Sequence, residues 1–142
     1  MEDNVKLKSL LCFPLYACSK EVVRLYRPHL EKLGLTYTQY IAMVVFWEVG
    51  KCNVKELGDK LCLDSGTLTP VLKCLEKKGL VRRYRSEEDE RVLFVELTEA
   101  GEEMRQEGIR IHGEMLKLFP LSIEETKQLY HLLYKALDGL RK

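Results

Sequence analysis

The chain has 142 residues, of which 46% are hydrophobic and 32% charged, and its 23 basic and 22 acidic residues leave a formal net charge of +1. These values exclude a disordered or collagen-like chain, and no apolar run reaches the roughly 20 residues that a membrane span needs. They also exclude a globally basic nucleic-acid-binding protein, so any affinity for nucleic acid must come from local clusters of charge.

The first predicted elements are helical. Apolar residues recur at helical spacing over residues 5–33, which predicts one long helix that ends at Gly34. Thr36 and Gln39 form a capping box, which predicts a second helix up to Gly50. A short third helix is predicted around residues 54–61.

A fourth helix is predicted to follow a cluster of N-cap side chains at residues 64–67 and to end at Gly79. Pro70 requires this helix to begin between Ser65 and Leu68, because proline is tolerated only in the first turn. The fourth helix is therefore expected to start late.

The pattern changes after this helix. Residues 80–86 and 91–97 alternate with period two around an acidic turn, which predicts a β-hairpin. Thr98 then caps a helix over residues 98–118, and a second capping box, Ser122 with Glu125, begins the last helix.

This order of elements is typical of a winged helix-turn-helix, so the predicted fold class is mainly α with one small β-hairpin. If the apolar stripe of the fourth helix is buried, its outer face consists of Ser65, Thr67, Thr69, Pro70 and Lys73. Small hydroxyls and an amine suit the edges of bases in the major groove. The hairpin adds four guanidinium groups for phosphates or a minor groove, those of Arg82, Arg83, Arg85 and Arg91.

The alternative for both features is structural. A Ser/Thr-rich turn before an apolar stripe also occurs as a capped core helix, and hairpins rich in Arg and Glu are often only solvated. Their adjacency and order favour DNA binding, because a wing must follow the recognition helix in the sequence.

The segment LDSGTLTPVLKCLEKKGLVRRYRSEEDERVLFVELTEAG, Leu63–Gly101, resembles the DNA-binding core of MarR-family regulators, and in detail the OhrR-like organic hydroperoxide repressors. The resemblance implies a homodimer on a palindromic double-stranded operator. It implies a single MarR-like domain with a DNA-binding lobe at residues 36–97 and dimerisation helices at 1–35 and 98–142, although these apolar helices would equally suit a monomer core. It also implies that Asp89 braces Arg91 for the minor groove.

The segment LCFPLYACSKE, Leu11–Glu21, resembles the segment that holds the peroxidatic cysteine in OhrR-like repressors, which here is Cys12. Tyr26 and Tyr37 match the tyrosine pair that contacts the cysteine of the other subunit, and Tyr16 matches a further position. The resemblance implies oxidation by organic hydroperoxide. Because nothing after Cys74 resembles a resolving cysteine, it also implies a mixed disulfide with a low-molecular-weight thiol.

Helix geometry separates these residues within one chain. Cys12 and Tyr26 lie 14 positions apart, which is roughly 21 Å along a continuous helix. A contact between them therefore requires two chains packed antiparallel. The apolar Leu11, Phe13 and Leu15 beside the thiol would favour an organic peroxide over hydrogen peroxide.

The remaining chemistry-bearing residues favour packing. The five cysteines form no CxxC pair, and the three histidines form no ligand cluster, so neither a metal nor a cofactor is expected. Free thiols suit a reducing cytoplasm, and we expect the other four cysteines, at positions 18, 52, 62 and 74, to be inert packing residues. We likewise expect Trp47 to lie in the core or at an interface rather than in a cofactor site.

Two alternative functions stay open at this point. A MarR-like regulator could be released by a small aromatic ligand in the cleft beside the DNA-binding lobe, with Cys12 as a bystander. A thiol peroxidase is less favoured, because no arginine or threonine neighbours Cys12 and an enzyme has no need of a recognition helix; we therefore expect no enzymatic activity.

A lipoprotein signal was also considered, because Lys6 and Lys8 precede an apolar run that ends in LYAC at Cys18. Acidic residues at positions 2 and 3 and a proline at position 14 argue against it. We expect an intracellular protein without a membrane partner.

Overall fold

The computed structural model describes residues 5–142, so residues 1–4 of the predicted 1–35 segment, with Glu2 and Asp3, lie outside the described residues. The chain divides into two compact units, Met1–His112 and Gly113–Lys142, which are described separately. None of the helices within residues 5–142 combines the length and the apolar character that a membrane span requires.

The first helix is shorter than predicted. A 3-10 turn, η1 (Leu7–Ser9), precedes α1 (Cys12–Glu31), and the backbone at Leu10 between them is extended. The predicted continuous helix over residues 5–33 is therefore wrong at its beginning. Proline has no N–H and is tolerated in the first turn of a helix, and a start at Cys12 places Pro14 there.

Two of the next three helices begin at predicted caps, whereas no cap was predicted for the short helix between them. The capping box of Thr36 and Gln39 opens α2 (Tyr37–Val49), and Asn53 caps α3 (Val54–Leu61). Asp64 caps α4 (Ser65–Lys77), the recognition helix of the predicted motif. The chain passes from α3 to α4 through a left-handed residue, Cys62, with φ 56°.

Pro70 is the sixth residue of α4, so the predicted start of the helix is confirmed but the placement of Pro70 in its first turn is wrong. Pro70 offers no N–H to the carbonyl of Gly66 one turn earlier. Gly66 is exposed, so water can hydrate that carbonyl.

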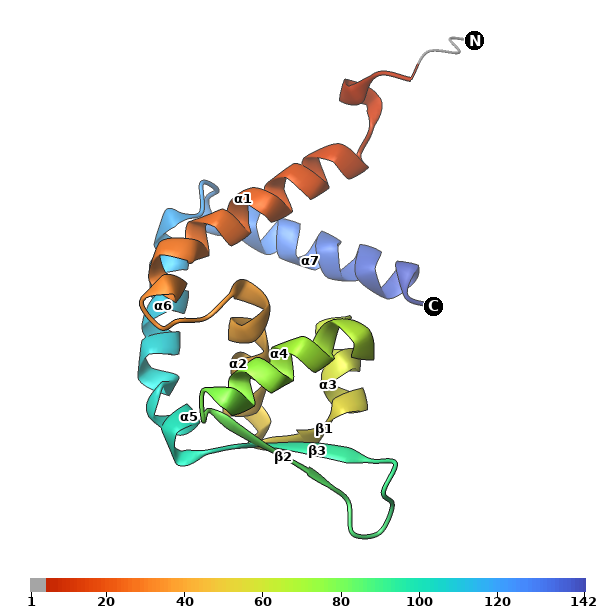
Figure 1. The fold of residues 1–142 in the computed structure, drawn as a ribbon. Helices are drawn as coiled ribbons and strands as arrows, with labels where there is room; N and C mark the ends of the chain where they lie inside the picture. Colours follow the sequence, from red (N-terminus) through yellow and green to blue (C-terminus); the bar gives the residue numbers. More distant parts are fainter. Residues whose placement is uncertain (1–4) are drawn as a thin grey trace. The chain divides into compact units, whose positions relative to one another are not determined.

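The sheet contains one strand that the sequence pattern missed. The predicted hairpin is present as β2 (Val81–Arg85) and β3 (Leu93–Leu97), which extend away from α2, α3 and α4 (Figure 1). A further strand, β1 (Lys51–Asn53), pairs antiparallel with β3, so the strand order is β1-β3-β2. Three residues are too few to display a period-two pattern.

The core of the first unit lies between α2, α3, α4 and the sheet. Phe46, Leu57 and Val95 are fully buried there, together with Leu68, Leu72 and Leu75 from the inner face of α4. Each buried leucine contributes about 1.5–3 kcal/mol relative to exposure. This burial fixes which face of α4 points to solvent.

The predicted helix over residues 98–118 is divided into α5 (Glu99–Glu103) and α6 (Arg105–Leu118). The N–H of Met104 between them is shared by the carbonyls of Gly101 and Glu102, which tightens the last turn of α5. In the second unit, α7 (Ile123–Leu140) begins at the predicted capping box of Ser122 and Glu125.

Candidate functional site

The outer face of α4 is available for contact with a partner. Its five predicted contact residues are all exposed, namely Ser65, Thr67, Thr69, Pro70 and Lys73. The opposite face is buried, as predicted from the apolar stripe. The predicted division of α4 into a buried face and a polar solvent face is thus confirmed.

Local hydrogen bonds fix the beginning of α4. The backbone N–H of Thr67 donates to Asp64 Oδ1 at 2.7 Å, and this bond holds the pKa of the Asp64 carboxyl below its usual value. The Thr69 hydroxyl donates to the carbonyl of Ser65 at 2.7 Å. Because its proton is engaged, the Thr69 oxygen faces solvent as an acceptor.

Three of the four hairpin arginines are held by carboxylates of the same chain, two of them on strand β2 and the third, Arg91, at the tip. Arg82 forms an ion pair with Glu96 on the neighbouring strand at 2.8 Å. Arg83 donates to Glu76 of α4 through its backbone N–H and its guanidinium, at 3.0–3.2 Å, and its side chain is only 22% exposed. Arg83 therefore ties the hairpin to the recognition helix, whereas Arg85 is exposed.

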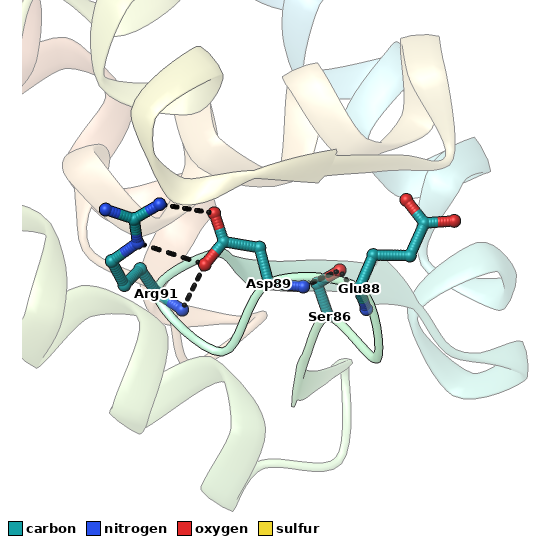
Figure 2. A network of polar contacts seen from close by, with 4 residues as sticks. All are labelled: Ser86, Glu88, Asp89 and Arg91. Atoms are coloured by element: carbon teal, nitrogen blue, oxygen red, sulfur yellow. Dashed lines mark hydrogen bonds and ion pairs between the residues drawn. The ribbon is translucent and has the colours of Figure 1, made fainter.

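The tip of the hairpin is preorganised (Figure 2). The Asp89 carboxylate accepts from the backbone N–H, Nε and Nη2 of Arg91 at 3.1–3.2 Å. These bonds hold the pKa of the Asp89 carboxyl below its usual value. Ser86 Oγ accepts from the N–H groups of Glu88 and Asp89, which orders the loop. The Asp89–Arg91 contact is thus present, with the Arg91 side chain 91% exposed.

Cys12 is exposed at the first position of α1. The apolar side chains of Leu11, Phe13 and Leu15 beside it are 78%, 41% and 47% exposed. Tyr16, one helical turn further, is also exposed and lies under the ammonium group of Lys20. An apolar surface of this kind around a thiol is typical of an interaction site.

The structure brings together the other two predicted tyrosines. The rings of Tyr26 on α1 and Tyr37 on α2 are 5.2 Å apart between centroids. Both are half-buried, and neither hydroxyl has a hydrogen-bond acceptor within residues 5–142. Burial raises the pKa of both phenols, so they stay protonated and can donate.

Cys12 does not reach this pair within its own chain. The helix α1 runs without interruption from Cys12 past Tyr26, which separates them by roughly 21 Å along its axis. Within one chain the predicted sensing residues therefore form two separate groups: Cys12 with Tyr16, and Tyr26 with Tyr37.

The other cysteines fall into two groups. Cys52 is buried, which raises the pKa of its thiol, and Cys74 is half-buried, as expected for packing residues. For Cys18 and Cys62 the expectation of burial is wrong, since both are exposed in this chain. Within residues 5–142 no group of three or more His, Cys, Asp or Glu side chains is placed to hold a metal ion.

A cavity of about 460 Å³ lies beside the phenol pair, within the first unit. Tyr26, Tyr40 and Trp47 line it together with Arg105 and His112. Its size and its aromatic walls suit a small aromatic molecule. Of the two places predicted for Trp47, core or interface, the structure shows the core, since the residue is 8% exposed.

Sequence reasoning missed the carboxylates that hold the wing, Glu76 and Glu96. Their partners Arg83 and Arg82 lie 7 and 14 positions away. Alternating charge on the two paired strands could have suggested the Arg82–Glu96 pair, because these residues are directly opposed in the register. No local pattern indicates the Glu76–Arg83 pair, which crosses a turn.

Comparisons with known proteins agree with this geometry. Residues 24–107 match the SarA/Rot family of transcriptional regulators. The organic hydroperoxide resistance transcriptional regulator of Bacillus subtilis is 46% identical over 140 residues, which cover 99% of this chain and 95% of that protein. SarZ, an HTH-type transcriptional regulator of Staphylococcus epidermidis, is 43% identical over 127 residues, covering 89% and 86%.

A solved structure of a DNA-bound protein has a similar fold. Reduced AbfR of Staphylococcus epidermidis bound to DNA matches with a TM-score of 0.80 and 32% identity, over 96% of this chain and 95% of that one. These relatives are regulators, and the peroxidase alternative finds no counterpart among them.

Proposed function

Because the chain belongs to the MarR family of transcriptional regulators, in its OhrR-like subgroup, we propose that it is a dimeric repressor that leaves a palindromic DNA operator when an organic hydroperoxide oxidises Cys12. The observation that carries the proposal is the half-buried Tyr26–Tyr37 pair, whose two hydroxyl donors lack an acceptor within residues 5–142. A thiolate supplied by a second chain would satisfy both donors.

The DNA contacts are assigned by exposure. In this proposal the outer face of α4, Ser65, Thr67, Thr69, Pro70 and Lys73, enters the major groove. Arg91, held by Asp89, enters the minor groove, and Arg82 and Arg85 contact phosphates. Arg83 acts through Glu76 by keeping the wing at a fixed angle to α4.

The dimer is assigned to the terminal helices. We place the DNA-binding lobe at residues 36–97 and the dimerisation helices at 1–35 and 98–142. Exposed apolar side chains on α1 and α7 support this assignment; they include Leu15, Leu25, Leu132, Leu133 and Leu137. Antiparallel pairing would bring Cys12 of one chain to the tyrosine pair of the other.

The proposed chemistry is a two-electron oxidation of sulfur. The Cys12 thiolate attacks the peroxide, an S–O bond forms as the O–O bond breaks, and the alkoxide leaves and takes a proton to become an alcohol. The sulfenic acid then condenses with a low-molecular-weight thiol, which gives a mixed disulfide and water. The sulfur no longer carries a negative charge, so the two phenols lose their strongest acceptor.

A DNA titration tests the proposal. DNA from upstream of the chain's own gene is titrated with and without cumene hydroperoxide, for the wild type, Cys12→Ser and the exposed control Cys62→Ser. We expect release of the wild type and of Cys62→Ser on oxidation, and no release of Cys12→Ser. Equal release of Cys12→Ser would contradict the sensing role.

A second candidate is favoured by the cavity of about 460 Å³ beside Tyr26 and Trp47. There a small aromatic ligand would release the DNA, and Cys12 would be a bystander. Release of Cys12→Ser and wild type by the same aromatic compound, at equal concentrations and without oxidant, would support this candidate.

A further inference from the structure

Four aromatic rings form a row that leads from the phenol pair into the interior of the first unit. Tyr26 lies 5.6 Å from Tyr40, and Tyr40 lies 6.2 Å from Trp47, between ring centroids. With Tyr37 at the outer end, the row passes from half-buried rings to two rings that are 5% and 8% exposed. A displacement of the Tyr26 ring would therefore also displace the buried rings of Tyr40 and Trp47.

The inner end of the row is hydrogen-bonded to α5 and α6. The Tyr40 hydroxyl donates to the carbonyl of Gly108 at 3.0 Å, and Trp47 Nε1 donates to the carbonyl of Gly101 at 2.8 Å, and both bonds are buried. A Cβ atom on Gly108 would overlap the Trp47 ring. Because no free space separates Gly108 from the indole ring, a movement of the ring must displace the backbone of α6.

On its other side α5 touches the joint between α4 and β2. Thr98, the N-cap of α5, donates through its N–H to the carbonyl of Leu80 at 3.1 Å and through its hydroxyl to that of Gly79 at 2.6 Å. A Cβ atom on Gly101 would overlap the Leu80 carbonyl. The helix α5 thus lies against the aromatic row and against the joint that sets the angle between recognition helix and wing.

We propose that Tyr40 and Trp47 are positioning residues that couple the Tyr26–Tyr37 pair to the recognition helix and wing. The coupling rests on the proposed function, because the partner's oxidised sulfur is what moves Tyr26. The ring of Tyr40 moves with that of Tyr26. The hydrogen bonds from Tyr40 and Trp47 then move the carbonyls of Gly108 and Gly101, and α5 displaces the joint at Gly79–Leu80. Couplings between sites typically change affinity 5–150-fold.

The measured quantity is the ratio of operator Kd after and before cumene hydroperoxide. Tyr40→Phe removes one donor without loss of ring volume, and replacement of Trp47 by benzothienylalanine removes the indole N–H from a ring of similar shape. We expect the reduced proteins to bind within about threefold of the wild type and the ratio to fall about fivefold or more. The matched control is Tyr84→Phe, which loses a hydroxyl outside the row and should keep the wild-type ratio.

Trp47 also provides a readout without DNA, because it is the single tryptophan of the chain. Its emission should change when the wild type is oxidised and stay constant in Cys12→Ser and Tyr26→Phe. Constant wild-type emission, with an undiminished ratio in both donor variants, would overturn the coupling and leave the repressor function standing. A wild type whose DNA binding ignores the oxidant would instead contradict the proposed function, and the coupling with it.

Discussion

The wing tip and the beginning of α1 differ in how complete they are within one chain. At the wing tip, Arg91 already donates three hydrogen bonds to the carboxylate of Asp89 two residues away, and its side chain is exposed to solvent. At the beginning of α1, Cys12 is exposed among apolar side chains, while Tyr26, whose ring contacts Tyr37, lies roughly 21 Å away along the helix. In the proposed function, the surface assigned to DNA is thus preorganised within one chain, whereas the site assigned to sensing is completed only by a second chain.

The largest expected effect comes from preventing that second chain from docking. Leu15→Glu places a charge on the exposed apolar surface beside Cys12. We expect a monomer whose affinity for a palindromic operator falls at least about 100-fold, because the second half-site contact is no longer intramolecular. Sedimentation velocity and DNA titration measure both changes.

The control for this experiment is Glu21→Lys, a charge change at an exposed polar position of the same helix. It should leave the dimer intact. A Leu15→Glu variant that stays dimeric and binds DNA normally would contradict the proposed dimer, because the apolar surface around Cys12 would then not be an interface.

The next effect tests the preorganised side. Arg91→Ala should lower operator affinity about 5- to 150-fold, which corresponds to about 1–3 kcal/mol for a groove contact. Its free energy of unfolding should not change, since the side chain is 91% exposed. Asp89→Asn should give a smaller loss, because the guanidinium is less firmly held. Glu90→Ala, at the same loop, is the control, and an equal loss in that variant would exclude a specific role for Arg91.

A third prediction separates two neighbouring wing arginines. Arg83→Met removes the guanidinium bonds to Glu76 and keeps the backbone one, and it should lower the free energy of unfolding by about 1–2 kcal/mol, since the pair is only partly exposed. Arg85→Met should leave stability unchanged and reduce the salt dependence of DNA binding. Denaturant unfolding and titrations at several salt concentrations distinguish them. Identical behaviour of both variants would remove the assignment of Arg83 as a tether.

The smallest effect concerns pH. Burial raises the pKa of Tyr40 to about 12, from an ordinary value of 10.0, and the neighbouring Tyr26 and Tyr37 add to the shift. The folded state holds this proton more tightly than the unfolded chain does. The stabilisation is therefore complete below pH 10 and is lost as the pH rises towards 12.

Unfolding at pH 9 and pH 11 measures this effect. We expect Tyr40→Phe to lose about 1 kcal/mol less than the wild type between these two values. Tyr130→Phe on α7, an exposed tyrosine, is the control and should behave as the wild type. An identical loss in Tyr40→Phe and wild type would show that Tyr40 ionises as easily in the folded as in the unfolded state.

The sequence by itself determined the features whose partners lie within a few residues. The caps at Thr36, Asp64 and Ser122 bond to N–H groups three positions later, and Asp89 bonds to Arg91 two positions later. The caps depend on local geometry alone, so residue type and spacing are enough to predict them, whereas the Asp89–Arg91 contact was expected from the resemblance to MarR-family regulators.

Only the tertiary structure decided the features whose partners are remote. β1 is a strand because β3, more than forty positions later, pairs with it, and α5, whose Gly101 packs against the joint after α4, ends before Met104. The row from Tyr26 to Trp47 is closed by carbonyls 54 and 68 positions from their donors. No short-range pattern encodes contacts that form only when the core excludes water and brings distant segments together.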